Sequence, residues 1–326
     1  MLYFCMANFW KLLPKSFLVL APMEDVTDVV FREIVAKELA RPDVFFTEFT
    51  SADGLFSEGR AKTIPRFKYS EKQRPIVAQI WGKNPENLYK AAQLVHQLKF
   101  DGIDINMACP DKAVLKKGCG GALIQNQTLA KQSIEAVREG SKDLPVSVKT
   151  RLGFDSIITE EWVTFLLRQK IDALTIHGRT VTQMSKGEAN WDEIGKAVKI
   201  KNKIAPETVL IGNGDVKSFE EALVLNKKYG VEGIMIGRGI FSNPWVFERT
   251  VGPQIHSKEK YIKILLKHLA LHDQTWGDTK HFDTLKKFFK MYIKNFAGAN
   301  ELRQKLMECK NSSEVRTILK LHFETI

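Results

Sequence analysis

Side chains that bind anions or move protons stand at the ends of short apolar runs throughout the first 240 residues. They are Glu24, Asp25, Glu48, Gln79, Asn106, Cys109, Lys149, Arg151, His177, Arg179, Asn213, Asp215 and Arg238. A purely structural domain does not need a lysine, a histidine and several arginines there, because each would have to be solvated or paired. The pattern predicts one functional site rich in cations, with a thiol nearby.

Two glycine turns are candidates for a phosphate site: Gly212–Asp215 and Gly237–Gly239. Glycines let backbone N–H groups approach an anion closely, and the N-terminus of a following helix adds a favourable dipole. Ser218 and Glu221 match a capping box that would start such a helix. Both turns could instead need glycine only for their conformation. Two such turns, one bearing Arg238, favour phosphate.

Cys109 is the candidate reactive thiol. It follows an apolar run and precedes a Lys- and Gly-rich loop, 112–121, which predicts an exposed, electropositive setting suited to a reactive or proton-donating cysteine. A free cysteine is more often a small buried apolar residue. Cys119, among glycines in the same loop, is the alternative donor. Cys5 and Cys309 are expected to be structural.

Two pairs of polar residues lie two positions apart, so that the members of each pair share one face of a strand. Lys149 and Arg151 would repel each other unless an anion lies near both. His177 could be an ordinary core histidine, but beside Arg179 we expect it to face the site. The following stretch, 184–191, predicts a loop that covers the substrate.

Eight apolar, β-rich runs alternate with amphipathic helical patterns. The runs are 17–22, 43–49, 76–82, 102–108, 146–152, 173–179, 209–215 and 233–239. Each is almost continuously apolar, as expected for strands buried on both faces. The alternative, an open doubly wound sheet, would carry GxGxxG after the first strand, which here ends in Ala21-Pro22-Met23. We therefore predict a (β/α)8 TIM barrel over residues 1–250, with its site at the carboxyl ends of the strands.

Residues 251–326 have helical periodicity without strand-like runs, which predicts a small C-terminal all-helical domain. The expected helices are 261–272, 281–296, 301–309 and 312–323. A buried stripe is predicted from Leu285, Phe288, Phe289, Tyr292, Ile293 and Phe296. This region has 14 Lys and Arg against 8 Asp and Glu, and Lys286, Lys287, Lys290 and Lys294 lie largely off the stripe. Alone they indicate a solvated face; with a site in the barrel they favour nucleic-acid contact.

The composition of the whole chain agrees with these expectations. The net charge of +11 over 326 residues suggests a polyanionic partner. None of the four cysteines forms a CxxC pair, so no zinc or iron–sulfur site is signalled. Residues 1–13 lack the basic start and cleavage site of a signal peptide, and no uncharged apolar stretch reaches the length of about 18 residues that spans a bilayer. We expect a cytoplasmic protein with no membrane contact and no metal.

The sequence resembles the tRNA-dihydrouridine synthase family. The matching motifs are APMEDVTD (21–28), INMACPDKAVLKKGCGGALI (105–124), VSVKTRLGFD (146–155), TIHGRTVTQMSKGEANW (175–191), IGNGDV (211–216) and IMIGRGIFSNPW (234–245). They occur in the family's order and spacing, and no single common motif generates the set. Ala108 stands where many members have glycine.

The resemblance implies reduction of uridine in tRNA to 5,6-dihydrouridine with non-covalent FMN; a monomer is the default expectation. The FMN phosphate would bind Asn213, Gly214, Asp215, Gly237 and Arg238, and the flavin and its ribityl chain would contact Pro22, Met23, Gln79, Lys149 and His177. Reduced FMN, regenerated by NADPH, would deliver hydride to C6, and Cys109 would protonate C5. Asn106, Arg151 and Arg179 are expected to hold the uracil and its backbone, and the helical domain to bind tRNA.

Two alternative functions are compatible with many of the same residues. Another FMN barrel, such as a dihydroorotate dehydrogenase or an ene-reductase, would share the phosphate turns but leave the basic helical tail without a purpose. An inactive RNA-binding barrel would be expected to lack the thiol and the flavin residues, whereas Cys109 and Lys149 are both present.

Overall fold

The structure is a computed structural model that describes residues 8–252 and 255–323. By its internal contacts the chain divides into two compact units. Among the described residues, the first comprises 8–29, 42–216 and 221–237, and the second comprises 30–41, 217–220, 238–252 and 255–323.

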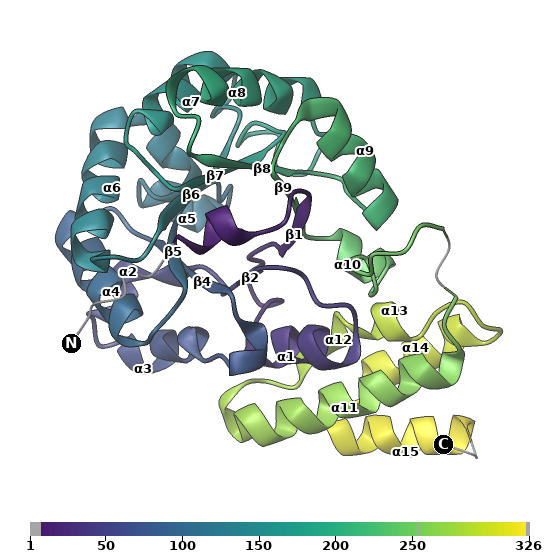
Figure 1. Cartoon of the computed structure of the whole chain (residues 1–326). Helices are drawn as coiled ribbons and strands as arrows, with labels where there is room; N and C mark the ends of the chain where they lie inside the picture. Colours follow the sequence, from purple (N-terminus) through teal and green to yellow (C-terminus); the bar gives the residue numbers. More distant parts are fainter. Residues whose placement is uncertain (1–7, 253–254, 324–326) are drawn as a thin grey trace, which may run out of the picture. The chain divides into compact units, whose positions relative to one another are not determined.

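Eight parallel strands form the barrel of the first unit (Figure 1). They are β1 (Phe17–Leu20), β2 (Phe45–Phe46), β4 (Ile76–Trp81), β5 (Gly102–Met107), β6 (Val146–Arg151), β7 (Ala173–His177), β8 (Val209–Asn213) and β9 (Gly233–Ile236). They are hydrogen-bonded in the order β1-β9-β8-β7-β6-β5-β4-β2, and a parallel bridge between Val19 and Val44 joins the two ends. The short β3 (Thr50–Ser51) pairs in parallel with the carboxyl end of β4. The predicted TIM barrel is confirmed, and all eight predicted runs contain its strands.

The longer helices of the first unit lie outside the ring of strands (Figure 1). They include α4 (Pro85–Gln97), α6 (Gln127–Ser141), α7 (Thr159–Leu167) and α8 (Trp191–Ile204), and α9 (Phe219–Tyr229) follows β8 in the chain. Asparagine side chains at Asn84, Asn126 and Asn190 accept backbone N–H groups at the starts of α4, α6 and α8. Shorter helices α2 (Ala52–Leu55), α3 (Arg60–Thr63) and α5 (Lys112–Lys116) lie in the loops.

The inside of the barrel is apolar at its base and polar above. The apolar core is formed by Trp10, Phe17, Val19, Ala21, Val44, Phe46, Val77, Ala173, Val209, Ile211 and Met235. Side chains alternate between the two faces of a strand, so residues two and four positions further along also point inward. Residues in register on a neighbouring parallel strand share that inward face. Toward the carboxyl ends these inward positions hold Gln79, Asp104, Asn106, Ser147, Lys149, Arg151, Thr175, His177 and Asn213.

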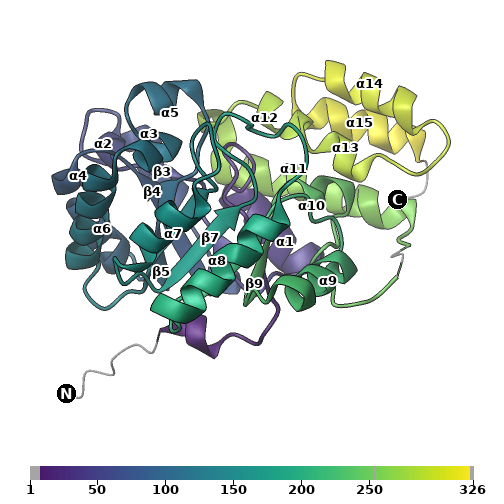
Figure 2. The same ribbon diagram turned by 90° about the horizontal axis from the view of Figure 1, so that it is seen from above.

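The second unit is helical (Figure 2). It contains α10 (Gly239–Ser242), α11 (Lys258–Trp276), α12 (Asp283–Lys286), α13 (Phe289–Tyr292), α14 (Ala299–Glu308), α15 (Ser312–His322) and nearly all of α1 (Val29–Glu38). The ring centroid of Phe31 on α1 lies 4.8 Å from that of Phe288 and 6.0 Å from that of His268. Lys267 forms an ion pair of 2.6 Å with Glu38. The predicted C-terminal helices are therefore present, and α1 joins them.

The predicted helix over 281–296 is wrong in its continuity, because the chain forms α12 and α13 with a break at residues 287–288. Around the break Phe288 N–H donates to Leu285 O and Met291 N–H to Phe288 O, both at 2.9 Å, the tighter i→i+3 pattern. Most of the predicted stripe is buried, but Met291 is buried as well. One face of a straight helix is too narrow for all of these residues, and the break widens the buried surface.

In the parts of the chain that the structure describes, none of the helices is both long enough and apolar enough to cross a membrane.

Candidate active site

Strand register brings most of the predicted site residues together at the carboxyl ends of neighbouring strands. Gln79 lies opposite Asp104, Asn106 opposite Lys149, and Lys149 opposite Thr175. One step further along, Arg151 lies opposite His177, which lies opposite Asn213. The site therefore occupies the mouth of the barrel, on the side formed by β4 to β8.

The loop after β5 is held by the amide of Asn106. Its Oδ1 accepts the backbone N–H groups of Ala108 and Cys109, both at 3.0 Å, and its Nδ2 donates to Gln79 Oε1 at 3.1 Å. Asn106 was predicted to hold the uracil; in the structure both ends of its amide bind the protein itself. Its visible role is to fix the backbone on which Cys109 stands.

Cys109 is buried rather than exposed, contrary to the setting expected from the sequence. Its side chain is 8% exposed and packs against Val114 and Cys119, with Phe49 and Trp81 beside them. The loop folds back on itself through the N–H of Gly121, which donates to Cys109 O at 3.0 Å. Burial raises the pKa of the Cys109 thiol. The thiol is therefore protonated at neutral pH, as a proton donor must be.

Cys119, the alternative proton donor, is more deeply buried than Cys109. It is fully buried, its Sγ lies 3.7 Å from Lys117 O, and burial raises the pKa of its thiol to about 11. Of these two thiols, Cys109 retains the greater access to a ligand.

A cavity of about 460 Å³ lies beside the Cys109 loop. Its lining is Glu24, Phe49, Ser51, Lys62, Thr63, Arg66, Trp81, Asp111 and Val114. Arg66 donates to both carboxylate oxygens of Glu24, at 2.6 and 2.5 Å, which fixes one wall. Phe49, Trp81 and Arg66 were not predicted as site residues. Trp81 could have been found, since it follows Gln79 by two positions and shares its face.

Lys149 is a buried cation without a counter-ion bond. Its side chain is 9% exposed, and burial lowers the pKa of its ammonium to about 8; Arg151 acts in the same direction and Asp104 in the opposite one. Among the described residues this ammonium has no hydrogen-bond or ion-pair partner. The nitrogen itself retains some contact with solvent, so a ligand with an acceptor or an anionic edge would take the place of that water.

Two further buried donor atoms at the same end of the barrel have no partner in the described chain. They are Thr175 Oγ1, on a side chain that is 1% exposed, and Arg179 Nη1, on one that is 2% exposed. Together with Lys149 they form a set of donors that a polar cofactor rich in carbonyl and phosphate oxygens would satisfy. The residues present therefore fit a flavin nucleotide.

Arg151 was predicted to hold the uracil or its backbone, and in the structure its guanidinium joins two loops. Nε donates to Ala108 O at 2.8 Å, next to Cys109, and Nη1 donates to Thr180 O and Met184 O, both at 2.9 Å. The side chain is buried. It therefore ties the thiol-bearing loop to the loop after β7.

Arg179 and Asp215 form an ion pair of 2.5 Å that fastens the predicted covering loop. Arg179 also donates to Gly187 O at 2.5 Å, and Asp215 accepts the N–H of Ala189 at 2.8 Å. Gly214 has a φ of +137°, and a Cβ there would lie 2.5 Å from the Cβ of Ala189. Glycine is needed at this position both for its conformation and for close packing against the covering loop.

The remaining predicted cofactor residues lie around the same turns. Asn213 Nδ2 donates to Met235 O at 2.8 Å, so its amide joins β8 to β9. The Met23 N–H donates to Thr27 Oγ1 at 2.9 Å, Pro22 is half-buried beside it, and Gly237 stands opposite the Met23 side chain. Gly237 ends the first unit, and Arg238 is the N-cap residue of α10 in the second.

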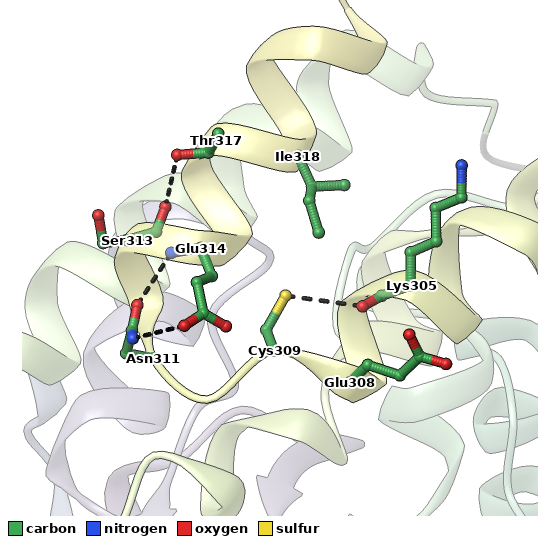
Figure 3. Close-up of a pocket in the computed structure, with 8 residues that line it drawn as sticks. All are labelled: Lys305, Glu308, Cys309, Asn311, Ser313, Glu314, Thr317 and Ile318. Atoms are coloured by element: carbon green, nitrogen blue, oxygen red, sulfur yellow. Dashed lines mark hydrogen bonds between the residues drawn. The ribbon is translucent and has the colours of Figure 1, made fainter.

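Cys309 occupies a packed position between α14 and α15 (Figure 3). Its buried Sγ lies 3.6 Å from Lys305 O, at one side of a hollow of about 520 Å³ that is also lined by Ile318. Burial raises the pKa of this thiol. These contacts match the structural role expected for it; Cys5 lies outside the described residues.

No group of three or more His, Cys, Asp or Glu within residues 8–252 and 255–323 is arranged to hold a metal ion.

Comparison with known proteins identifies the family. The family model described as dihydrouridine synthase matches residues 19–325. The chain is 45% identical over 315 residues to the probable tRNA-dihydrouridine synthase 2 of Bacillus subtilis (strain 168), covering 96% of this chain and 95% of that protein. It is 43% identical over 315 residues to the probable tRNA-dihydrouridine synthase of Staphylococcus aureus (strain COL), covering 96% and 94%.

Solved structures share the barrel. Morphinone reductase matches with a TM-score of 0.51 and 12% identity, over 72% of this chain and 84% of that one. The 6-hydroxypseudooxynicotine amine oxidase of Pseudomonas geniculata N1 matches with a TM-score of 0.53 and 11% identity, over 70% and 46%. These two show the fold alone, whereas the family model and the relatives span nearly the whole sequence. The chain belongs to the dihydrouridine synthase family.

Proposed function

We propose that this enzyme reduces uridine in tRNA to 5,6-dihydrouridine, with Cys109 as the general acid. The observation that carries the proposal is a protonated thiol, fixed through Asn106, at the same barrel mouth as a buried ammonium, Lys149, that has no partner among the described residues. Family membership supports the same reaction, since the relatives are named for it.

The chain would hold FMN with the residues around the two glycine turns and the inward face of β6 and β7. Lys149 would meet the pyrimidine end of the flavin, and His177 would contact ring or ribityl atoms, with Pro22 and Met23 alongside. Gln79, which the sequence also placed at the flavin, is fully buried with both ends of its amide bonded to protein, so it would support the site from below. The phosphate would bind Asn213, Gly214, Asp215, Gly237 and Arg238. Because Asn213 Nδ2 and the Asp215 carboxylate already have protein partners, Gly214 and its neighbours would offer mainly backbone N–H groups.

Uracil chemistry assigns the role of Cys109. The C5=C6 bond of uridine is conjugated to the C4 carbonyl, which makes C6 electrophilic and C5 basic once C6 has gained a hydride. When bound, FMN would supply that hydride, with NADPH as the source of its electrons. The Cys109 S–H bond would break as the C5–H bond forms, and the thiolate would recover its proton from solvent. Arg151 and Asn106 would keep the thiol in place during this transfer.

The second unit would bind tRNA through its phosphates. A groove of about 720 Å³ is lined by Lys286, Lys287, Phe289, Lys290, Asn300, Arg303, Gln304, Met307 and Glu308. The lining holds four cations and one carboxylate, and one of the cations, Lys286, also pairs with Asp283 at 2.7 Å. The remaining surplus of positive charge suits a phosphate backbone. The target uridine would leave its stack to reach the barrel mouth, as in other enzymes that act on bases. We further propose a monomer in the cytoplasm, where its free cysteines would remain reduced.

The test is reduction of unmodified tRNA by the purified, flavin-loaded enzyme with NADPH, followed by mass-spectrometric mapping of dihydrouridine. We expect dihydrouridine to form at defined positions, and the same positions to lose it in cells that lack the gene. The rival function is an ene-reductase or dihydroorotate dehydrogenase acting on a small molecule. An enzyme that reduces free enones or oxidises dihydroorotate efficiently but leaves tRNA unchanged would support that rival instead.

Replacing Lys286, Lys287 and Lys290 together with alanine is expected to weaken tRNA binding and to flatten its salt dependence. Each phosphate contact contributes about 0.7–0.9 to the slope of log K against log salt, so loss of three would reduce the slope by roughly 2–3. Filter binding across a salt series measures this slope.

The matched control replaces three exposed lysines of the first unit, Lys199, Lys203 and Lys227, with alanine. Flavin content should be unchanged in both triple variants, and the slope should change only in the first. Equal slopes in the two variants would show that the groove is an ordinary solvated surface.

A further inference from the structure

A chain of hydrogen bonds runs from a fully buried carboxylate to the backbone of Cys109. Asp104 accepts Ser147 Oγ on Oδ1 at 2.6 Å and Gln79 Nε2 on Oδ2 at 2.8 Å. Gln79 Oε1 then accepts Asn106 Nδ2 at 3.1 Å. Asn106 Oδ1 ends the chain on the N–H groups of Ala108 and Cys109. All members except the two backbone groups point into the barrel from β4, β5 and β6.

The donors and acceptors in this series of hydrogen bonds can be assigned in only one way. A carboxylate can only accept and a backbone N–H can only donate, while each side-chain amide has one donor end and one acceptor end. With Asp104 fixing the donor end of Gln79, the acceptor end of Gln79 fixes the donor end of Asn106. The acceptor end of Asn106 is then left facing the loop. Without an acceptor at position 104, Gln79 Nε2 would lose its partner, and the Gln79 amide could move away from Asn106 Nδ2 and leave the Asn106 side chain without its support.

The electrostatics of the site are consistent with an ionised Asp104 at neutral pH. Burial raises the pKa of this carboxyl to about 6, against the opposing effects of the bonds from Ser147 and Gln79 and of the nearby Lys149 ammonium. Asp104 does not reach the barrel mouth, since it is fully buried below Asn106. It therefore acts through other groups.

We propose that Asp104 is a positioning residue: its carboxylate orients the Gln79 and Asn106 amides and thereby sets the position of Cys109. The geometric proposal stands on the bonds above, and its consequence for turnover rests on the proposed role of Cys109 as the general acid. A misplacement of about 1 Å in a reacting group can cost on the order of 100-fold in rate. Loss of the acceptor at 104 should therefore impair proton donation to uracil far more than it impairs folding.

The experiment compares Asp104→Val with Asp104→Asn in the flavin-loaded enzyme. Valine fills much of the space of aspartate and has no acceptor. Asparagine restores the chain, because its carbonyl can accept from Gln79 while its amide donates to the Ser147 hydroxyl. Two quantities are measured: the alkylation rate of Cys109 relative to that of Cys119, by mass spectrometry of an iodoacetamide time course, and the rate of uridine reduction relative to NADPH oxidation by the flavin alone.

Asp104→Val is expected to change the Cys109 alkylation rate several-fold with Cys119 unchanged, and to lower the ratio of uridine reduction to NADPH oxidation by about 10- to 100-fold. Asp104→Asn should bring both quantities most of the way back to those of the unaltered enzyme. If asparagine behaves like valine, the charge of Asp104 matters and its hydrogen bonding does not, and the proposal is overturned. An equal increase in the alkylation rates of Cys109 and Cys119 would overturn the proposal too, because it would indicate a general loosening of the fold.

Asp104→Ser is the second variant, should the valine protein not fold. Its hydroxyl is too short to reach Gln79, so the same change confined to Cys109 is expected. The alkylation measurement requires no tRNA chemistry. If Cys109→Ala proved fully active while Asp104→Val still altered Cys109 alone, the proposed function would fail and the positioning role would stand.

Discussion

Cys109→Ala is expected to lower uridine reduction in tRNA by about 10²–10⁴-fold, the usual cost of a lost general acid. The thiol is protonated and held at the barrel mouth, whereas alanine offers no proton for C5. Flavin binding and flavin reduction by NADPH should be unchanged, because the residues expected to hold the cofactor remain. Single-turnover kinetics with pre-reduced enzyme and tRNA measure the affected step directly, and absorbance of the bound flavin measures the other two.

The matched control for this variant is Cys119→Ala, in the same loop. Cys119 is fully buried and its thiol has a pKa of about 11, so it should contribute packing and no proton transfer. Near-normal uridine reduction is expected after this change. If Cys109→Ala remained active and Cys119→Ala lost activity, the acid would be Cys119, and full activity in both variants would assign the proton to water.

Lys149→Met is expected to slow the reduction of bound flavin by NADPH by about 10²–10³-fold, the cost of removing one preorganised group from a developing charge. The ammonium is buried, has no partner among the described residues and is placed where the pyrimidine end of the flavin is proposed to lie. Methionine keeps the length of the side chain and removes its charge. Stopped-flow absorbance measures the rate, and Lys149→Arg, which restores the charge, should recover part of it.

The same variant makes a prediction about stability and pH. Burial lowers the pKa of folded Lys149 to about 8, against the ordinary lysine value of 10.5 in the unfolded chain. Between these values the unfolded chain binds more protons at this position, so the stability of the flavin-free native protein should rise with pH relative to Lys149→Met. Thermal unfolding of both flavin-free proteins from pH 7 to 10 measures the difference. A constant difference would show that Lys149 titrates normally.

The barrel could be predicted from the sequence because its signal is local. Strands such as 173–177 and 209–213 lie within continuous apolar runs that end in polar residues, and their repetition with helices specifies parallel pairing. The association of α1 with the later helices could not be predicted, since Phe31 and Phe288 meet across 257 positions and no local pattern encodes that contact.

The candidate site was predictable where a polar residue stands out against an apolar run, as Lys149 and His177 do. Asp104 did not stand out, because it lies inside the run 102–108 and its significance comes from Gln79 on the neighbouring strand. Arg151 and Arg179 were predicted as ligand contacts from their charge and their position at the strand ends. Their bonds to loop carbonyls depend on how the loops fold back, which strand patterning leaves undetermined.

The ion pair between Arg179 and Asp215 has a consequence for ligand entry. Arg179 uses Nε and Nη2 to hold the stretch from Lys186 to Gly187, while Nη1 has no partner within the described chain. An incoming phosphate or carbonyl can therefore gain a bond from this guanidinium without displacing Asp215. These bonds order the covering segment before the ligand arrives. The entropy lost by ordering this segment is therefore part of the free energy of folding and does not reduce the affinity for the ligand.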